Sequence, residues 1–197
     1  MNKFRLSTVL CSILCTLATS LVAMTPAHAD SQPINMPGTS SYYQFIDGSY
    51  SWEQANALAS STLYQGTRGH LVYINSSSEN EFVASLLKQV DIHLHNAWIG
   101  GRDIGSVGSN SRVWQWGDSS TFTTCPTNGN TCVNSAFSSW DTVTGQPSGG
   151  GERYLNMAQS GLWNDCANLC GGVTGTGFVI EFELSGQPLL QSSLSAI

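Results

Sequence analysis

The feature that most constrains the fold is a change of hydrophobic period near residue 90. Before this point, Trp52, Ala55 and Ala59 recur at helical spacing, and a second helical stripe begins at Phe82. From Ala97 onward the helical period disappears, and short apolar runs bounded by turn residues take its place. Two early helices followed by strands predict an α+β fold with antiparallel sheets.

Local signals place the individual elements. Ser51 and Gln54 have the spacing of a capping box, which predicts a helix over 51–62. Ser78 and Glu81 have the same spacing and predict the start of the second helix. Short strands are expected at 41–46, 71–74, 97–100, 114–116, 154–157, 162–163 and 178–184.

A stretch rich in glycine, serine and threonine runs from Gly117 to Gly151 and interrupts the strands. Loops of more than about 12–15 residues inside a compact domain are usually functional or disordered. We favour function, because Gln146-Pro147-Ser148, Glu152 and Asn164-Asp165 gather oxygen-bearing side chains around its end. Oxygen-rich clusters carried on loops are what a hard cation such as calcium requires.

The first 29 residues have the pattern of an export signal. Lys3 and Arg5 precede the apolar stretch 9–22, and Ala27-His28-Ala29 is a small-x-small cleavage site. The apolar stretch is shorter than the roughly 20 residues of a membrane-spanning helix. We therefore expect a signal peptide over 1–29, no membrane insertion after its removal, and a secreted protein, extracellular or periplasmic.

The remaining chain divides into a flexible lead over 30–41, one domain over 42–184 and a flexible tail over 185–197. Without Lys3 and Arg5, five basic residues face 13 acidic ones, for a net charge of −8. This balance argues against nucleic acid and anionic membranes as partners. The chain shows no Gly-x-Ser-x-Gly elbow, His-Glu-x-x-His or phosphate-binding loop, so we expect no enzyme.

Four cysteines remain after the signal, an even number in an exported chain, which predicts two disulfides. Four cysteines allow three pairings. We favour the two local ones, Cys125–Cys132 and Cys166–Cys170. A zinc site with four thiolates is the alternative, which an oxidising destination disfavours.

The ordered motifs of this chain resemble those of the C-type lectin-like domain family. The resemblance covers about residues 42–184, and the ordered set is far more specific than any single piece. The matching motifs are Trp52-Glu53-Gln54-Ala55, Gly69-His70-Leu71-Val72-Tyr73-Ile74, Trp98-Ile99-Gly100-Gly101, Trp114-Gln115-Trp116-Gly117-Asp118-Ser119-Ser120, Gln146-Pro147-Ser148, Trp163-Asn164-Asp165 and Phe178-Val179-Ile180-Glu181-Phe182.

The resemblance implies two helices packed on small antiparallel sheets and a calcium-assisted sugar site in the long loop region. Carried over residue by residue, the calcium ligands would also bind the sugar, and Pro147 would follow a cis peptide bond. Gln146 leans toward galactose-type glycans. The implied ligands are Gln146, Ser148, Glu152, Asn164 and Asp165.

Two departures from the family pattern qualify these expectations. Ser148 replaces an amide or carboxylate, so only Glu152 and Asp165 bring negative charge, and we expect weak calcium binding in the roughly 10⁻⁴–10⁻³ M range. The usual long-range disulfides are missing, which suggests a bacterial-type member. Ala59, Tyr154 and Ile180 stand where three of the family's cysteines would be, so the fold would depend on packing.

Packing in this chain would be anchored by its tryptophans. We expect Trp52, Trp98, Trp116 and Trp163 in the core, because large aromatic side chains dominate core energetics. Trp140 could instead be a platform on which a sugar stacks, and we favour a structural role for it.

Two functions remain in competition. The first is a secreted, calcium-assisted carbohydrate-binding protein. The second is a lectin-like fold used for recognition of a cell-surface protein or for adhesion, without calcium or sugar. Ser148 is the feature that favours the second function.

Overall fold

The computed structural model describes residues 32–89, 96–105, 111–126, 132–149, 151–170 and 177–184. The expected signal peptide (1–29) and the expected tail (185–197) lie outside the described residues. Within the described part of the chain, no helix combines the length and the apolar character needed to cross a membrane.

Helix α1 (Trp52–Ser61) begins where the sequence predicts it. The Ser51 hydroxyl accepts a hydrogen bond from the backbone N–H of Gln54, and the Gln54 side chain accepts one from the backbone N–H of Ser51. This reciprocal pair satisfies two backbone donors that the first turn of a helix leaves without partners. The predicted capping box is therefore confirmed.

Helix α2 (Ser77–Gln89) begins earlier than predicted. The Ser76 hydroxyl, and not that of Ser78, accepts the backbone N–H of Glu79, at 3.2 Å. Glu79 is buried and its carboxylate accepts the backbone N–H of Asn75, so the expected partnership between Ser78 and Glu81 is wrong. Ser76 and Glu79 have the same Ser-x-x-Glu spacing as Ser78 and Glu81, so the spacing alone did not distinguish the two caps.

The strands form one large, mostly antiparallel sheet with the order β1-β2-β12-β6-β7-β8-β9. Strand β10 pairs with β6 and β11, and β5 pairs with β12. The bounds are β1 Ile34–Asn35, β2 Ser41–Ile46, β5 His70–Leu71, β6 Asn96–Asp103, β7 Ser111–Gln115, β8 Thr121–Pro126, β9 Val133–Asn134, β10 Tyr154–Ala158, β11 Trp163–Cys166 and β12 Phe178–Glu183. A separate pair consists of β3 (Leu63–Tyr64) and β4 (Thr67–Arg68).

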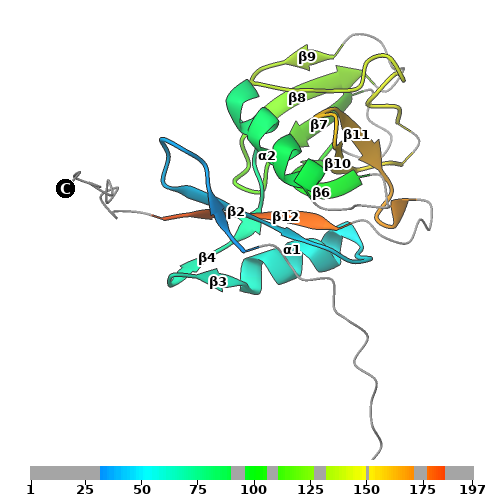
Figure 1. Cartoon of the computed structure of the whole chain (residues 1–197). Coiled ribbons are helices and arrows are strands. Elements are labelled where there is room, and N and C mark those ends of the chain that lie inside the picture. The colour runs from blue at the N-terminus through cyan, green and yellow to red at the C-terminus, as the bar shows by residue number, and fades with distance from the viewer. Residues whose placement is uncertain are drawn as a thin grey trace, which may run out of the picture.

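Figure 1 shows α1 beneath β2 and β12, with the strands from β6 to β11 and helix α2 gathered on the other side of these two strands. The expected α+β class, with two helices and antiparallel pairing, is confirmed.

Two segments that were expected to lack regular structure contain strands. Ile34–Asn35, in the expected lead, pairs with β2. The stretch from Gly117 to Gly151 contains β8 and β9. Its threonines are good strand formers, and Phe122 and Cys125 are buried. The long loop is therefore shorter than expected and comprises residues 135–153, of which Gly150 lies outside the description.

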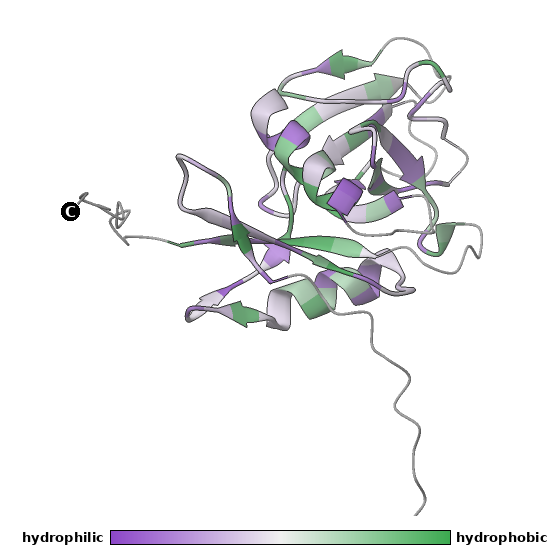
Figure 2. Cartoon of the chain, in the orientation of Figure 1, coloured by the Kyte–Doolittle hydropathy of each residue, from purple (hydrophilic) through white to green (hydrophobic). Residues whose placement is uncertain are grey.

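Two hydrophobic clusters hold the fold together, and Figure 2 shows hydrophobic residues along β12 in the middle of the sheet. One lies around α1 and includes Trp52, Trp98 and Ile180. The other lies beneath the long loop and includes Trp116, Trp140 and Trp163 among its many aromatic side chains. All four tryptophans predicted as core anchors are buried, which confirms that prediction.

Both favoured disulfides, Cys125–Cys132 and Cys166–Cys170, are present. Two of the positions where the family's cysteines would stand, Ala59 and Ile180, are fully buried and belong to the cluster around α1. Gly69 packs closely against both, because a Cβ atom there would lie 2.4 Å from Cγ2 of Ile180 and 3.1 Å from the carbonyl oxygen of Ala59.

Candidate functional site

The long loop is anchored at its base on strand β11. Trp140 forms a bridge to Trp163, and the backbone N–H of Asp141 donates to the carbonyl of Trp163 at 3.0 Å. The backbone N–H of Gln146 donates to the carbonyl of Asp141 at 3.0 Å. The Gln146–Pro147 peptide bond is cis, as expected. The tripeptide is therefore positioned directly over the strand that carries Asn164 and Asp165.

A pocket of about 380 Å³ opens beside the tripeptide. Its walls combine hydroxyl groups, two side-chain amides, one indole ring and a disulfide sulfur. The lining residues are Cys132, Asn134, Ser138, Ser139, Trp140, Thr142, Gly145, Gln146 and Pro147.

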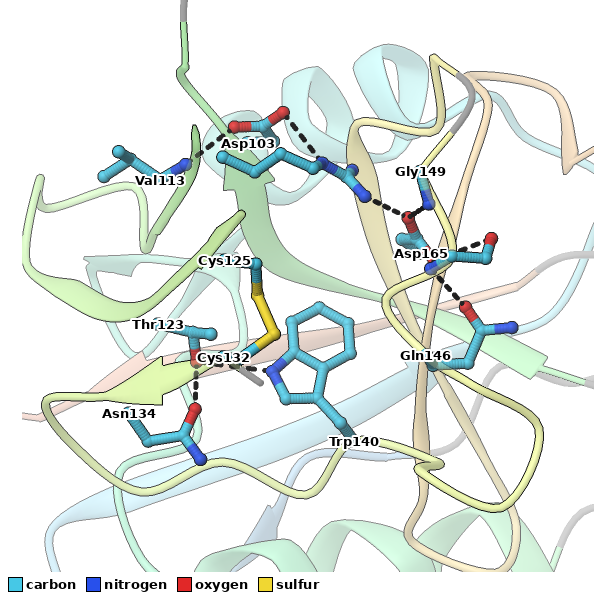
Figure 3. Close-up of a disulfide and its surroundings, with 12 residues drawn as sticks. Asp103, Val113, Thr123, Cys125, Cys132, Asn134, Trp140, Gln146, Gly149 and Asp165 are labelled. Carbon is cyan, nitrogen blue, oxygen red and sulfur yellow. Dashed lines mark hydrogen bonds and ion pairs between the residues drawn. A yellow bond between two sulfur atoms is a disulfide. The ribbon is translucent and has the colours of Figure 1, made fainter. Parts of the chain in front are cut away.

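Trp140 forms the buried wall of this pocket. It is only 7% exposed, and its indole N–H donates to the Thr123 hydroxyl at 3.3 Å. That hydroxyl donates in turn to the side-chain oxygen of Asn134 at 2.9 Å, as Figure 3 shows beside the Cys125–Cys132 disulfide. The ring also packs edge-on against Trp114. The structural role expected for Trp140 is confirmed, and its position adds an aromatic surface to the pocket.

Asp165 lies on the opposite side of the tripeptide and is almost completely buried, at 1% exposure. One carboxylate oxygen accepts the backbone N–H of Ser148 at 2.7 Å, and the other accepts that of Gly149 at 3.1 Å. The second oxygen also lies 2.6 Å from a guanidinium nitrogen of Arg112. The carboxylate thus holds the loop backbone and forms a buried ion pair at the same time.

Arg112 comes from strand β7 and is itself buried, at 7% exposure. Its Nε lies 3.2 Å from a carboxylate oxygen of Asp103, and its second terminal nitrogen donates to the backbone carbonyl of Glu152. The guanidinium carbon sits 4.7 Å from the centre of the Trp114 ring, a cation–π contact. Figure 3 shows Asp103 and Asp165 joined through this side chain.

The remaining candidate ligands are less buried than Asp165: Ser148 is exposed at the rim of the loop, and Gln146, Glu152 and Asn164 are half-buried. The Ser148 hydroxyl donates to the Glu152 carboxylate at 2.6 Å, and the Gln146 side-chain oxygen accepts the backbone N–H of Ser148 at 3.0 Å. Four of the five candidates, Gln146, Ser148, Glu152 and Asp165, are therefore linked by hydrogen bonds. Asn164 is half-buried on β11 and makes no side-chain hydrogen bond to the described members of this group.

Sequence reasoning missed Arg112 and Asp103, which we group with Ser148, Glu152 and Asp165 as the loop cluster. The sequence contained a signal that Arg112 belongs to this site. In a strand, residues two apart share a face, so Arg112 lies on the same face as the buried Trp114. A buried arginine requires an acidic partner, and Asp103 and Asp165 were available. Their separation from Arg112 along the chain concealed the connection.

The arrangement does not fit a calcium ion as the resemblance implies. Calcium takes roughly 6–8 oxygen ligands, whereas the oxygens of Asp165 are already engaged by two N–H groups and a guanidinium. Among the described residues, no group of three or more His, Cys, Asp or Glu side chains is placed to hold a metal ion. A cation at Asp165 would also meet the positive charge of Arg112.

A second buried acidic group lies away from the loop. The Tyr43 hydroxyl sits 2.8 Å from a carboxylate oxygen of Glu79 and 3.1 Å from one of Glu181. We call these three residues the sheet cluster. Burial, with a smaller contribution from the charge of Glu79, raises the pKa of Glu181 to about 7. Burial also raises the pKa of Glu79 and that of Tyr43.

Comparison with known proteins gives consistent results. The family model described as Lectin C-type domain matches residues 48–170. Lithostathine from Rattus norvegicus is 30% identical over 149 residues, which cover 73% of this chain and 74% of that protein.

Solved structures agree with this similarity. The C-type lectin CEL-I from Cucumaria echinata aligns with a TM-score of 0.58 and 19% identity, covering 79% of this chain and 97% of CEL-I. The C-type carbohydrate-recognition domain of cow CD23 was solved in the presence of a GlcNAc2Man3 oligosaccharide. It aligns with a TM-score of 0.54 and 24% identity, covering 80% of this chain and 100% of the CD23 domain. These likenesses confirm the expected fold. All of these relatives are animal proteins, so the expectation of a bacterial-type member finds no support.

Proposed function

The chain belongs to the C-type lectin domain family, and on this premise we propose that it is an exported carbohydrate-binding protein whose glycan site lies beside the long loop. The observation that carries this proposal is the pocket of about 380 Å³ between Trp140 and Gln146. Its size falls within the roughly 300–1,000 Å³ of small-molecule sites.

The chemistry of the pocket suits a sugar. A pyranose presents hydroxyl groups around its edge and C–H groups on its faces, so it needs both hydrogen-bonding partners and an apolar surface. Ser138, Ser139 and Thr142 offer hydroxyls that donate and accept, and the amides of Asn134 and Gln146 do the same. Trp140 and Pro147 supply the apolar surface. The relatives named as a lectin and as a carbohydrate-recognition domain support the same class of ligand.

The candidate residues take different roles in this proposal. Gln146 lines the pocket and also bonds the loop backbone, so it is the residue we assign to direct contact with a glycan. Ser148 and Glu152 lie at the rim and would bind an extended glycan. Asp165 holds the tripeptide from β11, and Asn164 beside it stays a predicted ligand. A galactose-type preference stays a prediction that rests on Gln146.

Calcium assistance, which the resemblance to the family implies, is the finer form of this hypothesis and is the alternative that the glycan array tests. It requires Arg112 to leave Asp165, so carbohydrate binding is proposed here without a step through calcium. Export rests on the signal-like pattern of residues 1–29. We propose binding and not catalysis, because the chain lacks the nucleophile, metalloprotease and phosphate-loop motifs considered above.

A glycan array probed with the mature protein tests the proposal, once in calcium and once in EGTA. Binding to any glycan in either buffer supports it, and dependence on calcium decides the finer form. We expect Gln146→Ala to weaken binding about tenfold, the loss of roughly 1.4 kcal/mol from one hydrogen bond. Gln89→Ala is the matched control, because Gln89 lies exposed on α2. No glycan binding in either buffer contradicts the proposal.

Recognition of a cell-surface protein is the second candidate function. Val143 in the long loop is 94% exposed and Val133 in β9 is 69% exposed. A protein partner with an apolar surface would bury these side chains on binding. A Val143→Asp variant that loses cell binding but keeps glycan binding would favour this function.

A further inference from the structure

We propose that Arg112 is a permanent internal cation that takes the place of calcium in this chain, so that the long loop adopts its working conformation without a divalent ion. The part of this proposal that concerns ligand binding rests on the proposed function. The part that concerns the loop stands on geometry alone.

The contacts of the guanidinium are those of a central ion. Each of its three nitrogens faces an oxygen acceptor on a different segment: Asp103 on β6, Asp165 on β11 and the carbonyl of Glu152 at the end of the long loop. The ring of Trp114 covers one face. Because the side chain is only 9% exposed, these contacts replace its hydration almost completely.

The two buried carboxylates of the loop cluster have positively charged partners without a metal. Asp103 and Asp165 have side chains that are 8% and 0% exposed, and two buried carboxylates require positive charge nearby. Arg112 contacts both, and Arg153 adds a longer contact of 3.8 Å to Asp103. A divalent ion added at Asp165 would face the guanidinium of Arg112 directly.

The same side chain closes the loop. Asp165 accepts the backbone N–H groups of Ser148 and Gly149, while Arg112 holds both Asp165 and the carbonyl of Glu152. The segment from Ser148 to Glu152 is thus fixed at both ends by one ion pair. In this sense Arg112 is a positioning residue, which acts on the glycan site through the backbone of the tripeptide.

Hydrogen exchange of the Ser148 and Gly149 amides tests the proposal directly, because both donate to Asp165. In the wild-type protein we expect the same exchange rates and the same midpoint of thermal unfolding in about 10 mM calcium as in EGTA. This concentration would saturate an extracellular-type site. Slower exchange or a higher midpoint in calcium would overturn the proposal without any variant being needed.

Arg112→Ser supplies the second arm. In EGTA we expect these amides to exchange about 10- to 100-fold faster, the loss of one or two charge-assisted hydrogen bonds. We expect calcium to restore part of the protection, because the freed carboxylates and the Glu152 carbonyl then face a gap. Two results would overturn the proposal: unchanged exchange of the two amides in Arg112→Ser, or a loss of protection that calcium does not reverse. Either would show that Arg112 does not take the place of calcium.

Two further variants complete the experiment. Arg153→Ser removes an arginine that contacts Asp103 and is 34% exposed, and it should leave the exchange of Ser148 and Gly149 unchanged. Arg112→Lys retains the charge without the fork of donors and should exchange at an intermediate rate, which keeps the test open if Arg112→Ser does not fold. These measurements use no glycan, so their failure is distinguishable from a failure on the glycan array.

Discussion

The molecule buries carboxylates in two places and neutralises them in two different ways. In the loop cluster, Asp103 and Asp165 are both paired with the guanidinium of Arg112. In the sheet cluster, Glu79 and Glu181 meet at the hydroxyl of Tyr43, which donates only one hydrogen. The first arrangement depends on a fixed cation and the second on a proton. The loop should therefore keep its electrostatic balance at neutral pH, while the sheet should respond to pH.

The largest effect on the free energy of unfolding is expected from removing the positive charge of Arg112. Arg112→Met keeps most of the side-chain volume but leaves Asp165 buried without its partner, which should lower the free energy of unfolding by about 3–5 kcal/mol. Urea denaturation measures this change. In the Arg112→Met background, Asp165→Asn should cost less than it does in the wild-type protein, because the two charges act as one unit. Equal costs in both backgrounds would show that Arg112 and Asp165 contribute to the free energy of unfolding independently of each other.

The pH dependence of stability comes next. Glu181 has a pKa of about 7 in the folded protein, raised from 4.5. A raised acid pKa gives stability that is fully present below pH 4.5 and is lost as pH rises through 7, so its contribution should fall by about 3 kcal/mol over this range. Urea denaturation at pH 5, 6, 7 and 8 should show this loss in the wild-type protein relative to Glu181→Gln. Parallel curves for the two proteins would show that the sheet cluster does not exchange a proton.

The smallest effect is expected at the rim of the loop cluster. The Ser148 hydroxyl bonds the Glu152 carboxylate, but Ser148 is exposed, so Ser148→Ala should change the free energy of unfolding by only about 0.5 kcal/mol. Its backbone N–H still donates to Asp165. A loss comparable to that of Arg112→Met would mean that the rim, and not the buried ion pair, holds the loop.

Much of the fold follows from local patterns in the sequence. The capping box at Ser51 and the alternation of Phe178, Ile180 and Phe182 specify α1 and β12, because each pattern depends on residues a few positions apart. Strands β8 and β9 escaped prediction, since their threonines and their neighbouring glycines also suit a loop. Only pairing with β7 distinguishes the two possibilities.

The site was predictable only in part. The ordered motifs brought Gln146, Ser148, Glu152 and Asp165 to one place, and the structure links them by hydrogen bonds. The counter-charge was not predictable from the same motifs. Arg112 reaches Asp165 across 53 positions of sequence, and such a pairing depends on which strands become neighbours.

The direction of β1 has a consequence for how the domain can be attached to other structures. Strand β1 pairs antiparallel with β2, and β2 pairs antiparallel with β12, so β1 and β12 run in the same direction. The described chain therefore enters this part of the sheet at one end and leaves it at the other. A protein fused before β1 and a protein fused after β12 would meet the domain at different ends of these strands, both away from β8 and β9 in Figure 1.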